Sequence, residues 1–547
     1  MKSLTDATSL QADIAPASPV EAVGCPADVD ALTRVITQQE EVIEKKSTVI
    51  AEQQKRIALL EEYLRLERAR LYGRSSEKSS AQGDIFNEAE LAGCGESEEE
   101  TASSEPGKKR PKSRGRKPLS PALPRYQEHV ELSAEEKEGA IDTFFTKVRE
   151  ELDIIPAKVR VKEILQEKAV FLEKNETAES QRVIKAAELP RHPIPKSAVT
   201  TDMLAYLIVA KYCDALPLYR LETILSRYGG SVTRTTMANW LIRLSLQLQG
   251  LINLMYDHQR SGLVINADET RVQVLKERSK SINSDKYMWV TLGGPPGQTA
   301  VLFDYDPSRS KEVPLRLFEG FSGYLQTDGY ASYNAVCRQE GITQLGCFDH
   351  VRRKFTDAKK GEVKESGKKK QKSPRVSKAD VALSKIRKLY AVEADIGSLS
   401  PEQKYQQRQV RSKPLLDELH GWLEKNIVRV MPDSLIHTAM KYALNQWPKL
   451  IVYCEDGHLS ISNAAAENAI RPFTIGRKNW LFADTPKGAR ASAIYYSLIE
   501  SAKANGLEPF AYLSHILKAL PYAETVEQLE QLLPWAVSVS GALSKNG

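Results

Sequence analysis

Several features are scarce or missing in this sequence of 547 residues. Its six cysteines include no Cys-x-x-Cys pair and no spacing typical of a disulfide framework, which favours a reducing cytosol. The most apolar stretch, residues 203–212, is too short to cross a membrane and contains Lys211. Residues 1–16 lack the apolar core of a signal peptide. We therefore expect a cytoplasmic protein without a membrane partner.

A strong excess of one charge is also missing. The chain carries 77 Lys and Arg residues against 71 Asp and Glu, and its formal net charge is only +6. This balance does not by itself indicate a polyanionic partner, so the distribution of charge along the chain matters more than its sum. The length exceeds what one ordinary core supports, and we expect two or more folded units joined by linkers.

Apolar residues recur at every seventh position between residues 29 and 72. They are Ile36, Ile43, Ile50, Ile57, Leu64 and Leu71. This spacing predicts a long helix with a coiled-coil seam, and hence a homo-oligomer. The partner positions of the same heptads are poorer, because only Leu32 and Leu60 are apolar there. A lone amphipathic helix packed on the rest of the chain is the alternative.

Two segments are predicted to be disordered, residues 1–28 and residues 73–125. The second is rich in Ser, Glu, Gly and Lys and changes from an acidic to a basic run, so we expect a charged linker. Its basic part, with Arg114, Arg116 and Lys117, resembles an AT-hook, whose extended arginines fit a narrow minor groove. A merely solvated linker would show the same short pattern.

Two short apolar stripes in residues 196–255 predict a helix-turn-helix. Gly229 and Gly230 supply the turn, and Thr233 is the expected N-cap of the second helix. The side chains expected to contact DNA from the start of that helix are Arg234, Thr235, Thr236 and Asn239. A helical hairpin inside a larger all-helical unit would give the same pattern.

The hydrophobic period shortens between residues 262 and 347. The strand-like runs are residues 263–265, 287–291, 299–303 and 323–325. They predict a compact mixed sheet. Beyond residue 350 the pattern is mainly helical, so we expect an α/β core with a helical insertion at about 356–450 and a helical tail at 506–547.

Two acids follow strand-like runs closely. Asp268 and Asp328 are each expected to end an apolar strand, and acids at neighbouring strand ends can converge on one ion. Gly329 would let the backbone turn away and leave the Asp328 carboxylate accessible.

A third acid, Glu467, lies in a predicted helix that Asn463 is expected to cap. Ala466, Ile470 and Phe473 would form the packed face of that helix, one residue away from Glu467. Arg471, one turn later, would face a scissile phosphate, or else form a surface ion pair with Glu467.

Three acids are enough for metal-assisted cleavage of a phosphodiester. Two divalent cations can activate a water and stabilise the leaving oxygen together, and Mg²⁺ needs only one or two carboxylates for each ion. Taken singly, each acid is more often a solvated or capping residue. The prediction therefore depends on Asp268, Asp328 and Glu467 meeting in space.

Several sequence blocks resemble the transposases of the insertion sequence 66 family, in consistent order from about residue 190 to residue 535. The blocks are residues 211–220 (KYCDALPLYR), 267–270 (ADET), 326–330 (QTDGY), 347–355 (CFDHVRRKF), 469–473 (AIRPF) and 476–482 (GRKNWLF). The resemblance implies a DDE transposase of the bacterial cytoplasm, associated with the nucleoid. It also implies DNA as partner, both the terminal inverted repeats of the element and the target, and accessory proteins encoded by the same element.

The resemblance further implies a ribonuclease H-like catalytic domain at residues 256–505. Its catalytic and metal-binding residues would be Asp268, Asp328 and Glu467, with two Mg²⁺ ions, or Mn²⁺ in their place. The chain departs from the family pattern around Glu467 at Ser462, Ala464 and Asn468. These departures leave open an alternative, an oligomeric DNA-binding regulator or a catalytically inactive transposase remnant.

Zinc is not expected. Residues 126–195 stand where family members commonly carry a small zinc module of paired cysteines, yet this segment has no cysteine. Cys347 and His350 form a Cys-x-x-His pair, but two ligands do not close a tetrahedral site, so roles in packing and orientation are favoured.

A group of basic residues near the acids is expected to hold DNA phosphates. They are Arg352, Arg353, Lys354, Arg477 and Lys478. Ordinary surface charge is the alternative for each of them. A tyrosine recombinase is a rival interpretation, because residues 350–353 also fit a His-x-x-Arg pair, and it predicts a covalent phosphotyrosyl link without a metal requirement.

Overall fold

The structure is a computed structural model that describes most of the chain from residue 29 onward. The described residues are 29–72, 133, 145–146, 158–174, 180–277, 284–362 and 376–537. The predicted linkers, with Arg114, Arg116 and Lys117, lie outside them. Among the described residues, no helix has both the length and the apolar character needed to cross a membrane.

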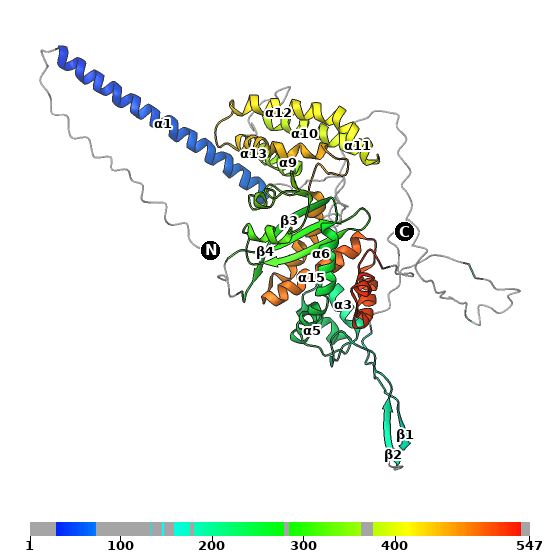
Figure 1. Cartoon of the computed structure of the whole chain (residues 1–547). Helices are drawn as coiled ribbons and strands as arrows, with labels where there is room; N and C mark the ends of the chain where they lie inside the picture. The colour runs from blue at the N-terminus through cyan, green and yellow to red at the C-terminus, as the bar shows by residue number, and fades with distance from the viewer. Residues whose placement is uncertain are drawn as a thin grey trace, which may run out of the picture.

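The long N-terminal helix is confirmed as α1 (Val29–Tyr72). Figure 1 shows it projecting from the rest of the molecule, with only its C-terminal end in contact. There Leu66 is buried beside Ala358 and Leu435. The seam residues further up the helix face solvent, and Ile43 is 66% exposed. A 44-residue helix therefore carries an uncovered apolar seam.

The described part of the predicted small domain contains one antiparallel hairpin. Its strands are β1 (Lys168–Lys174) and β2 (Ser180–Ala186), and Figure 1 shows the hairpin extending away from the core. Its apolar residues Val170 and Ile184 are largely exposed.

The expected mixed sheet is present, and strands β3 to β6 match the four predicted runs. Its strands are β3 (Val264–Val274), β4 (Lys286–Gly293), β5 (Ala300–Asp306), β6 (Gly323–Gln326) and β7 (Ile342–Leu345). The spatial order is β5-β4-β3-β6-β7, in which β3 to β5 form an antiparallel meander and β6 and β7 add in parallel. A short strand, β8 (Phe482–Ala483), pairs with the far end of β3.

Alternate residues of the sheet enter two separate cores, as a pleated strand requires. Val290 of β4 packs in the larger helical core, whereas its neighbour Trp289 packs in the smaller one. The helices of the larger core are α3 (Thr201–Tyr212), α4 (Leu218–Arg227), α5 (Arg234–Gln247), α6 (Gln249–Arg260), α14 (Ala464–Trp480), α15 (Pro486–Ala504) and α16 (Pro509–Ala519). Those of the smaller core are α7 (Glu312–Leu317) and α8 (Tyr333–Val336).

The predicted pair of short helices is present as α4 and α5. Gly229 has φ +82° in the turn between them, and the Thr233 hydroxyl accepts a hydrogen bond from the Thr236 amide, as expected for an N-cap. Helix α5 also packs against α15, where the Tyr495 hydroxyl donates to the Leu241 carbonyl at 2.6 Å. The helix pair is thus joined to the helical layer of the sheet.

A separate group of helices, visible at the top of Figure 1, lies between β7 and α14 in the sequence. Its members are α9 (Phe348–Gly361), α10 (Lys378–Asp395), α11 (Pro401–Gln407), the π-helical turn η1 (Arg408–Ser412), α12 (Lys413–Ile427), α13 (Leu435–Leu450) and the 3-10 turn η2 (Val452–Cys454). Helices α9, α10, α12 and α13 and the turn η2 share one core with the end of β7. Buried Arg408 ties the group together through Glu393 and three backbone carbonyls.

The C-terminal segment is helical and contributes to the main core. Tyr512 and Leu517 of α16 are fully buried, and the Tyr512 hydroxyl donates to the Leu532 carbonyl. The remaining short elements are the 3-10 turn η3 (Leu520–Tyr522) and α17 (Val526–Glu530). The segment therefore belongs to the same packed body as α3 and α15.

Candidate active site

Asp268 lies in the middle of β3, so the expectation that it ends the strand is wrong. Antiparallel pairing with β4 continues as far as Val272, whereas parallel pairing with β6 stops at Asn266 and Gln326. Asp268 therefore stands two residues beyond the end of its parallel neighbour, and its side chain is half-buried. The apolar run in the sequence ends where β3 stops pairing with β6. The part of β3 that goes on pairing with β4 has no apolar run, so the sequence does not predict it.

Asp328 follows β6, as predicted, and Gly329 turns the backbone after it. Gly329 has φ +85°, and a Cβ there would lie 2.9 Å from Oε1 of Gln446. The Tyr442 hydroxyl donates to the Asp328 carbonyl at 2.7 Å, and the Tyr330 amide donates to the Asp328 carboxylate at 2.8 Å. Helix α13 thus fixes the backbone that carries this acid.

Glu467 occupies the first turn of α14. Ala466, Ile470 and Phe473 are buried against the sheet side, which confirms the predicted packed face. The predicted capping role of Asn463 is wrong, because its side chain makes no capping hydrogen bond. Its amide is fully buried and points into the sheet instead.

Asn463 belongs to a buried network of three amide side chains. The Asn266 amide donates to Oε1 of Gln326 at 2.7 Å and to Oδ1 of Asn463 at 3.0 Å. Asn463 in turn donates to the Ala267 carbonyl at 2.9 Å, and Gln326 donates to two further backbone carbonyls. Each amide precedes one of the three acids, by two residues or by one helical turn. The network therefore holds the three acid-bearing segments in one place.

The three acids are close enough to influence one another electrostatically. Burial first, and then the charges of Glu269, Asp328 and Glu467, raise the pKa of Asp268 to about 7, against one backbone hydrogen bond that lowers it. Holding several negative charges together in a partly buried site costs free energy unless a cation neutralises them. The structure thus places the three acids that the sequence singles out within electrostatic range of one another.

Glu269, next to Asp268, has a role that the sequence does not predict. Its side chain is 1% exposed and forms an ion pair with Arg309, whose Nε donates at 2.8 Å, and it accepts from the Tyr333 hydroxyl at 2.7 Å. Burial raises the pKa of Glu269. Arg309 also stacks on the Tyr330 ring at 3.6 Å. Arg309 thereby links the strand of Asp268 to the loop after Asp328. The only sequence signal for the role of Glu269 is its place in the ADET block.

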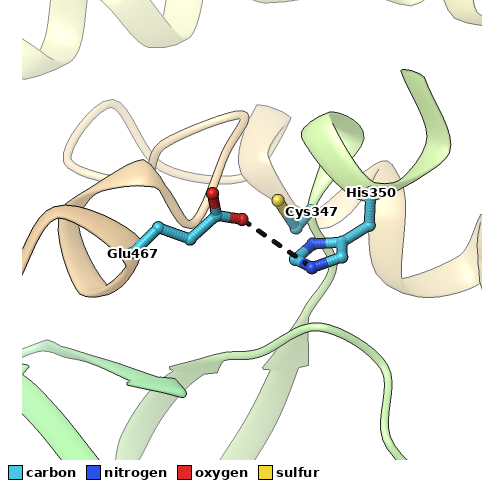
Figure 2. A group of neighbouring side chains, drawn as sticks. All are labelled: Cys347, His350 and Glu467. Atoms are coloured by element: carbon cyan, nitrogen blue, oxygen red, sulfur yellow. Dashed lines mark ion pairs between the residues drawn. The ribbon is translucent and has the colours of Figure 1, made fainter. Parts of the chain in front are cut away.

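Glu467 faces the start of α9, as Figure 2 shows. Its carboxylate lies 3.7 Å from Nε2 of His350 and 3.2 Å from a guanidinium nitrogen of Arg353. Burial, and next the charge of Arg353, lowers the pKa of His350. The Cys347 thiol beside them is buried, which raises its pKa to about 12, and its sulfur accepts a hydrogen bond from the backbone N–H of Asn463 at 3.1 Å.

The basic residues predicted on α9 make contacts within the protein. Arg352 forms an ion pair with Asp349 at 3.4 Å, and the Lys354 ammonium lies 4.8 Å from the centre of the Tyr442 ring. Of the three basic residues on α9, Arg353 contacts one of the acids, Glu467.

The other predicted DNA contacts fall into two groups. Arg477 donates to the Thr270 hydroxyl at 3.1 Å, and burial lowers its pKa, while Lys478 is exposed and Arg471 half-buried on α14. These three share the helix of Glu467. The second group lies on α5, apart from the acids, and consists of Arg234, Thr235, Thr236 and Asn239. Its members are exposed, except for half-buried Thr236.

The acidic group fits divalent cations with a preference for oxygen ligands. Three carboxylates from different segments lie within electrostatic range of one another near the end of the β3–β6 pairing, and a cation there would favour the charged form of Asp268, whose pKa is raised. Asp268, Asp328 and Glu467 are the residues that would hold such ions.

Comparison with known proteins identifies the class. Residues 196–491 match the family described as Transposase IS66 family, residues 497–535 match the IS66 C-terminal element, and residues 59–127 match a family described as Transposase C of IS166 homeodomain. The first match covers more than half of the chain. The chain therefore belongs to the IS66 family of transposases, a family that acts on DNA.

Three proteins of Sinorhizobium fredii (strain NBRC 101917 / NGR234) are similar over most of the chain. Uncharacterized protein y4qI is 30% identical over 397 residues, which cover 71% of this chain and 70% of that protein. Uncharacterized protein y4jD is 29% identical over 76% of this chain and 80% of its own length. Uncharacterized protein y4hP is 27% identical over 71% and 70%, respectively. These relatives agree with the family assignment.

The amide network gives a prediction for Asn463. Asn463→Ala should lower the free energy of unfolding by about 1 to 3 kcal/mol, because it leaves buried hydrogen-bonding groups without partners. DNA cleavage should fall as well, since the start of α14 is released from β3. Urea unfolding and an end-cleavage assay would measure the two effects.

The matched control is Asn468→Ala, on the exposed side of the same helix. It should change stability by less than about 0.5 kcal/mol. Equal effects of the two substitutions would mean that the network does not position Glu467.

Proposed function

We propose that this protein is a DDE transposase that binds the terminal inverted repeats of its element and catalyses metal-dependent DNA cleavage and strand transfer. The observation that carries the proposal is that a buried amide network anchors the segments of Asp268, Asp328 and Glu467, and that the charges of Asp328 and Glu467 act on Asp268. Membership of the IS66 family supports the substrate.

We further propose that the core is ribonuclease H-like. A meander of three antiparallel strands, continued by two parallel strands on the side of β3, supports this fold. The first acid then lies on the central strand and the second follows the adjacent parallel strand. The helices α9 to α13 would be the insertion of the family, between the second and third acids.

The chemistry divides between the ions and the residues of the chain. Bound Mg²⁺ supplies activation of a water or of a 3′-hydroxyl and stabilises the leaving oxygen. Asp268 and Asp328, on adjacent segments of the sheet, are fixed by the amide network and by the Glu269–Arg309 contact. Glu467 approaches from α14. Arg353 lies at hydrogen-bond distance from Glu467 and would turn to a DNA phosphate once that carboxylate holds metal.

An end-cleavage assay on the termini of the element tests the proposal. Cleavage should require Mg²⁺ or Mn²⁺ and should fall by roughly 1,000-fold in Asp268→Asn, Asp328→Asn and Glu467→Gln, since each change removes several kcal/mol of transition-state stabilisation. Exposed Glu319→Gln is the matched control and should cleave normally.

Two results would count against the DDE mechanism. Cleavage in the presence of chelator, with protein covalently attached to DNA, would favour a tyrosine recombinase. Normal DNA binding without cleavage under any metal condition would favour a regulator or an inactive remnant, the alternative that Ser462, Ala464 and Asn468 leave open.

We propose that the start of α5 contacts the terminal repeats. Arg234→Ala should lower the affinity for these repeats about tenfold and reduce the salt slope of binding by about 1, and Asn239→Ala should weaken the preference for them over unrelated DNA. Fluorescence anisotropy at several salt concentrations measures both effects. Arg243→Ala, exposed further along the same helix, is the control, and an equal loss there would exclude a specific role for the start of α5.

We also propose that α1 joins copies of the chain through its apolar seam, as a coiled coil. The seam is exposed in the single chain, and burial of apolar surface favours association. Ile43→Asp combined with Ile50→Asp should convert the oligomer to monomer in sedimentation or light scattering. Thr48→Asp, on the outer side of the same helix, should leave the mass unchanged. A wild-type protein that is already monomeric would contradict the proposal.

A further inference from the structure

Three donor atoms of different chemistry meet beside the acidic group. The Cys347 sulfur, a ring nitrogen of His350 and a carboxylate oxygen of Glu467 all lie within 4.8 Å of one another. Figure 2 shows the imidazole and the carboxylate facing each other, with the thiol next to both. Cys347 is the residue before α9 and His350 lies in the first turn of that helix, whereas Glu467 comes from the first turn of α14.

This donor set differs from the one that Mg²⁺ prefers. Thiolate and imidazole suit borderline-soft ions, and Zn²⁺ is commonly bound by Cys, His and carboxylate ligands in tetrahedral geometry. Three protein ligands would leave one position for water. The sequence shows only the Cys-x-x-His pair; the third ligand becomes visible when α14 is packed against the sheet.

We propose that Cys347, His350 and Glu467 form a Zn²⁺ site, and that Zn²⁺ bound there competes with the catalytic metal for Glu467. The competition between the two metals for Glu467 rests on the proposed function, whereas the Zn²⁺ site itself does not depend on it. In this proposal the Glu467 carboxylate turns either toward His350 or toward Asp268 and Asp328, and it binds one ion at a time. Zn²⁺ would therefore inhibit cleavage by withdrawing Glu467 from the catalytic group.

The surroundings are consistent with such a ligand set. Nδ1 of His350 is buried without a hydrogen-bond partner. The backbone N–H of Asn463 already donates to the Cys347 sulfur and would continue to stabilise it as a thiolate. Binding replaces the Arg353 contact of Glu467, and the thiol proton passes to solvent as the Zn–S bond forms. His350 binds in its neutral form, which its burial favours.

Cobalt spectroscopy on the full-length, chelator-treated protein tests the site directly. Added Co²⁺ should give the intense sulfur-to-cobalt charge-transfer band of a thiolate ligand, and Zn²⁺ should displace it. Cys347→Ser should abolish the band, and His350→Ala should weaken Co²⁺ binding by at least about 100-fold, since even indirect contacts to a ligand contribute 10- to 100-fold. Cys337→Ser, a cysteine outside the group, should retain the band.

Two controls keep the result interpretable. Thermal unfolding of each variant without metal shows whether the protein is folded, so a lost band in folded Cys347→Ser and His350→Ala supports the site. A band that survives Cys347→Ser, or that depends on Cys337, would overturn it.

Electron paramagnetic resonance of bound Mn²⁺ tests the competition without any cleavage. Zn²⁺ should raise the Mn²⁺ concentration needed for half-saturation at least tenfold in the wild-type protein, and this shift should disappear in Cys347→Ser. Equal shifts in both proteins would overturn the competition. Absence of Mn²⁺ binding in the wild-type protein would instead remove the proposed DDE chemistry, which the cobalt experiment does not require.

Discussion

Three amide side chains, Asn266, Gln326 and Asn463, form a hydrogen-bonded network under the acidic group, and the site depends on it. Buried amides must be satisfied, because a donor or acceptor left without a partner costs about 1 to 3 kcal/mol. Their mutual bonds therefore fix β3 against β6 and the start of α14 against β3. Each acid follows one of these amide residues closely in the sequence. The packing therefore places the acids near one another, although like charges repel.

Carboxylates held close together in this way repel one another electrostatically. Asp268 shows the effect most clearly, since burial and neighbouring acids raise its pKa to about 7. In the absence of metal, the protein offsets the remaining charge with its own cations, through Arg309 on Glu269 and Arg353 on Glu467. The site is thus arranged for cations that enter from solvent, and one of its acids, Glu467, lies beside a cysteine and a histidine.

Much of this arrangement could be predicted from the sequence, because it depends on local patterns. Apolar runs gave β3 to β6, the seven-residue repeat gave α1, and the stripe of Ala466, Ile470 and Phe473 gave the packed face of α14. Features that depend on distant contacts could not be predicted. Asn463 has the sequence signal of a cap, yet it bonds to a strand almost two hundred residues earlier. The sequence likewise does not reveal that Glu467 lies beside Cys347 and His350, or that Arg309 pairs with Glu269, because these residues are far apart in the chain.

Crystals grown with Mn²⁺ and DNA from the ends of the element would test the central claim most directly, because anomalous scattering locates the metal independently of any assay. The account predicts two Mn²⁺ ions about 4 Å apart, bound by Asp268 and Asp328 with Glu467 as a further ligand. Manganese bound elsewhere, or Glu467 remaining on Arg353 with the other two acids free of metal in the presence of DNA, would contradict it.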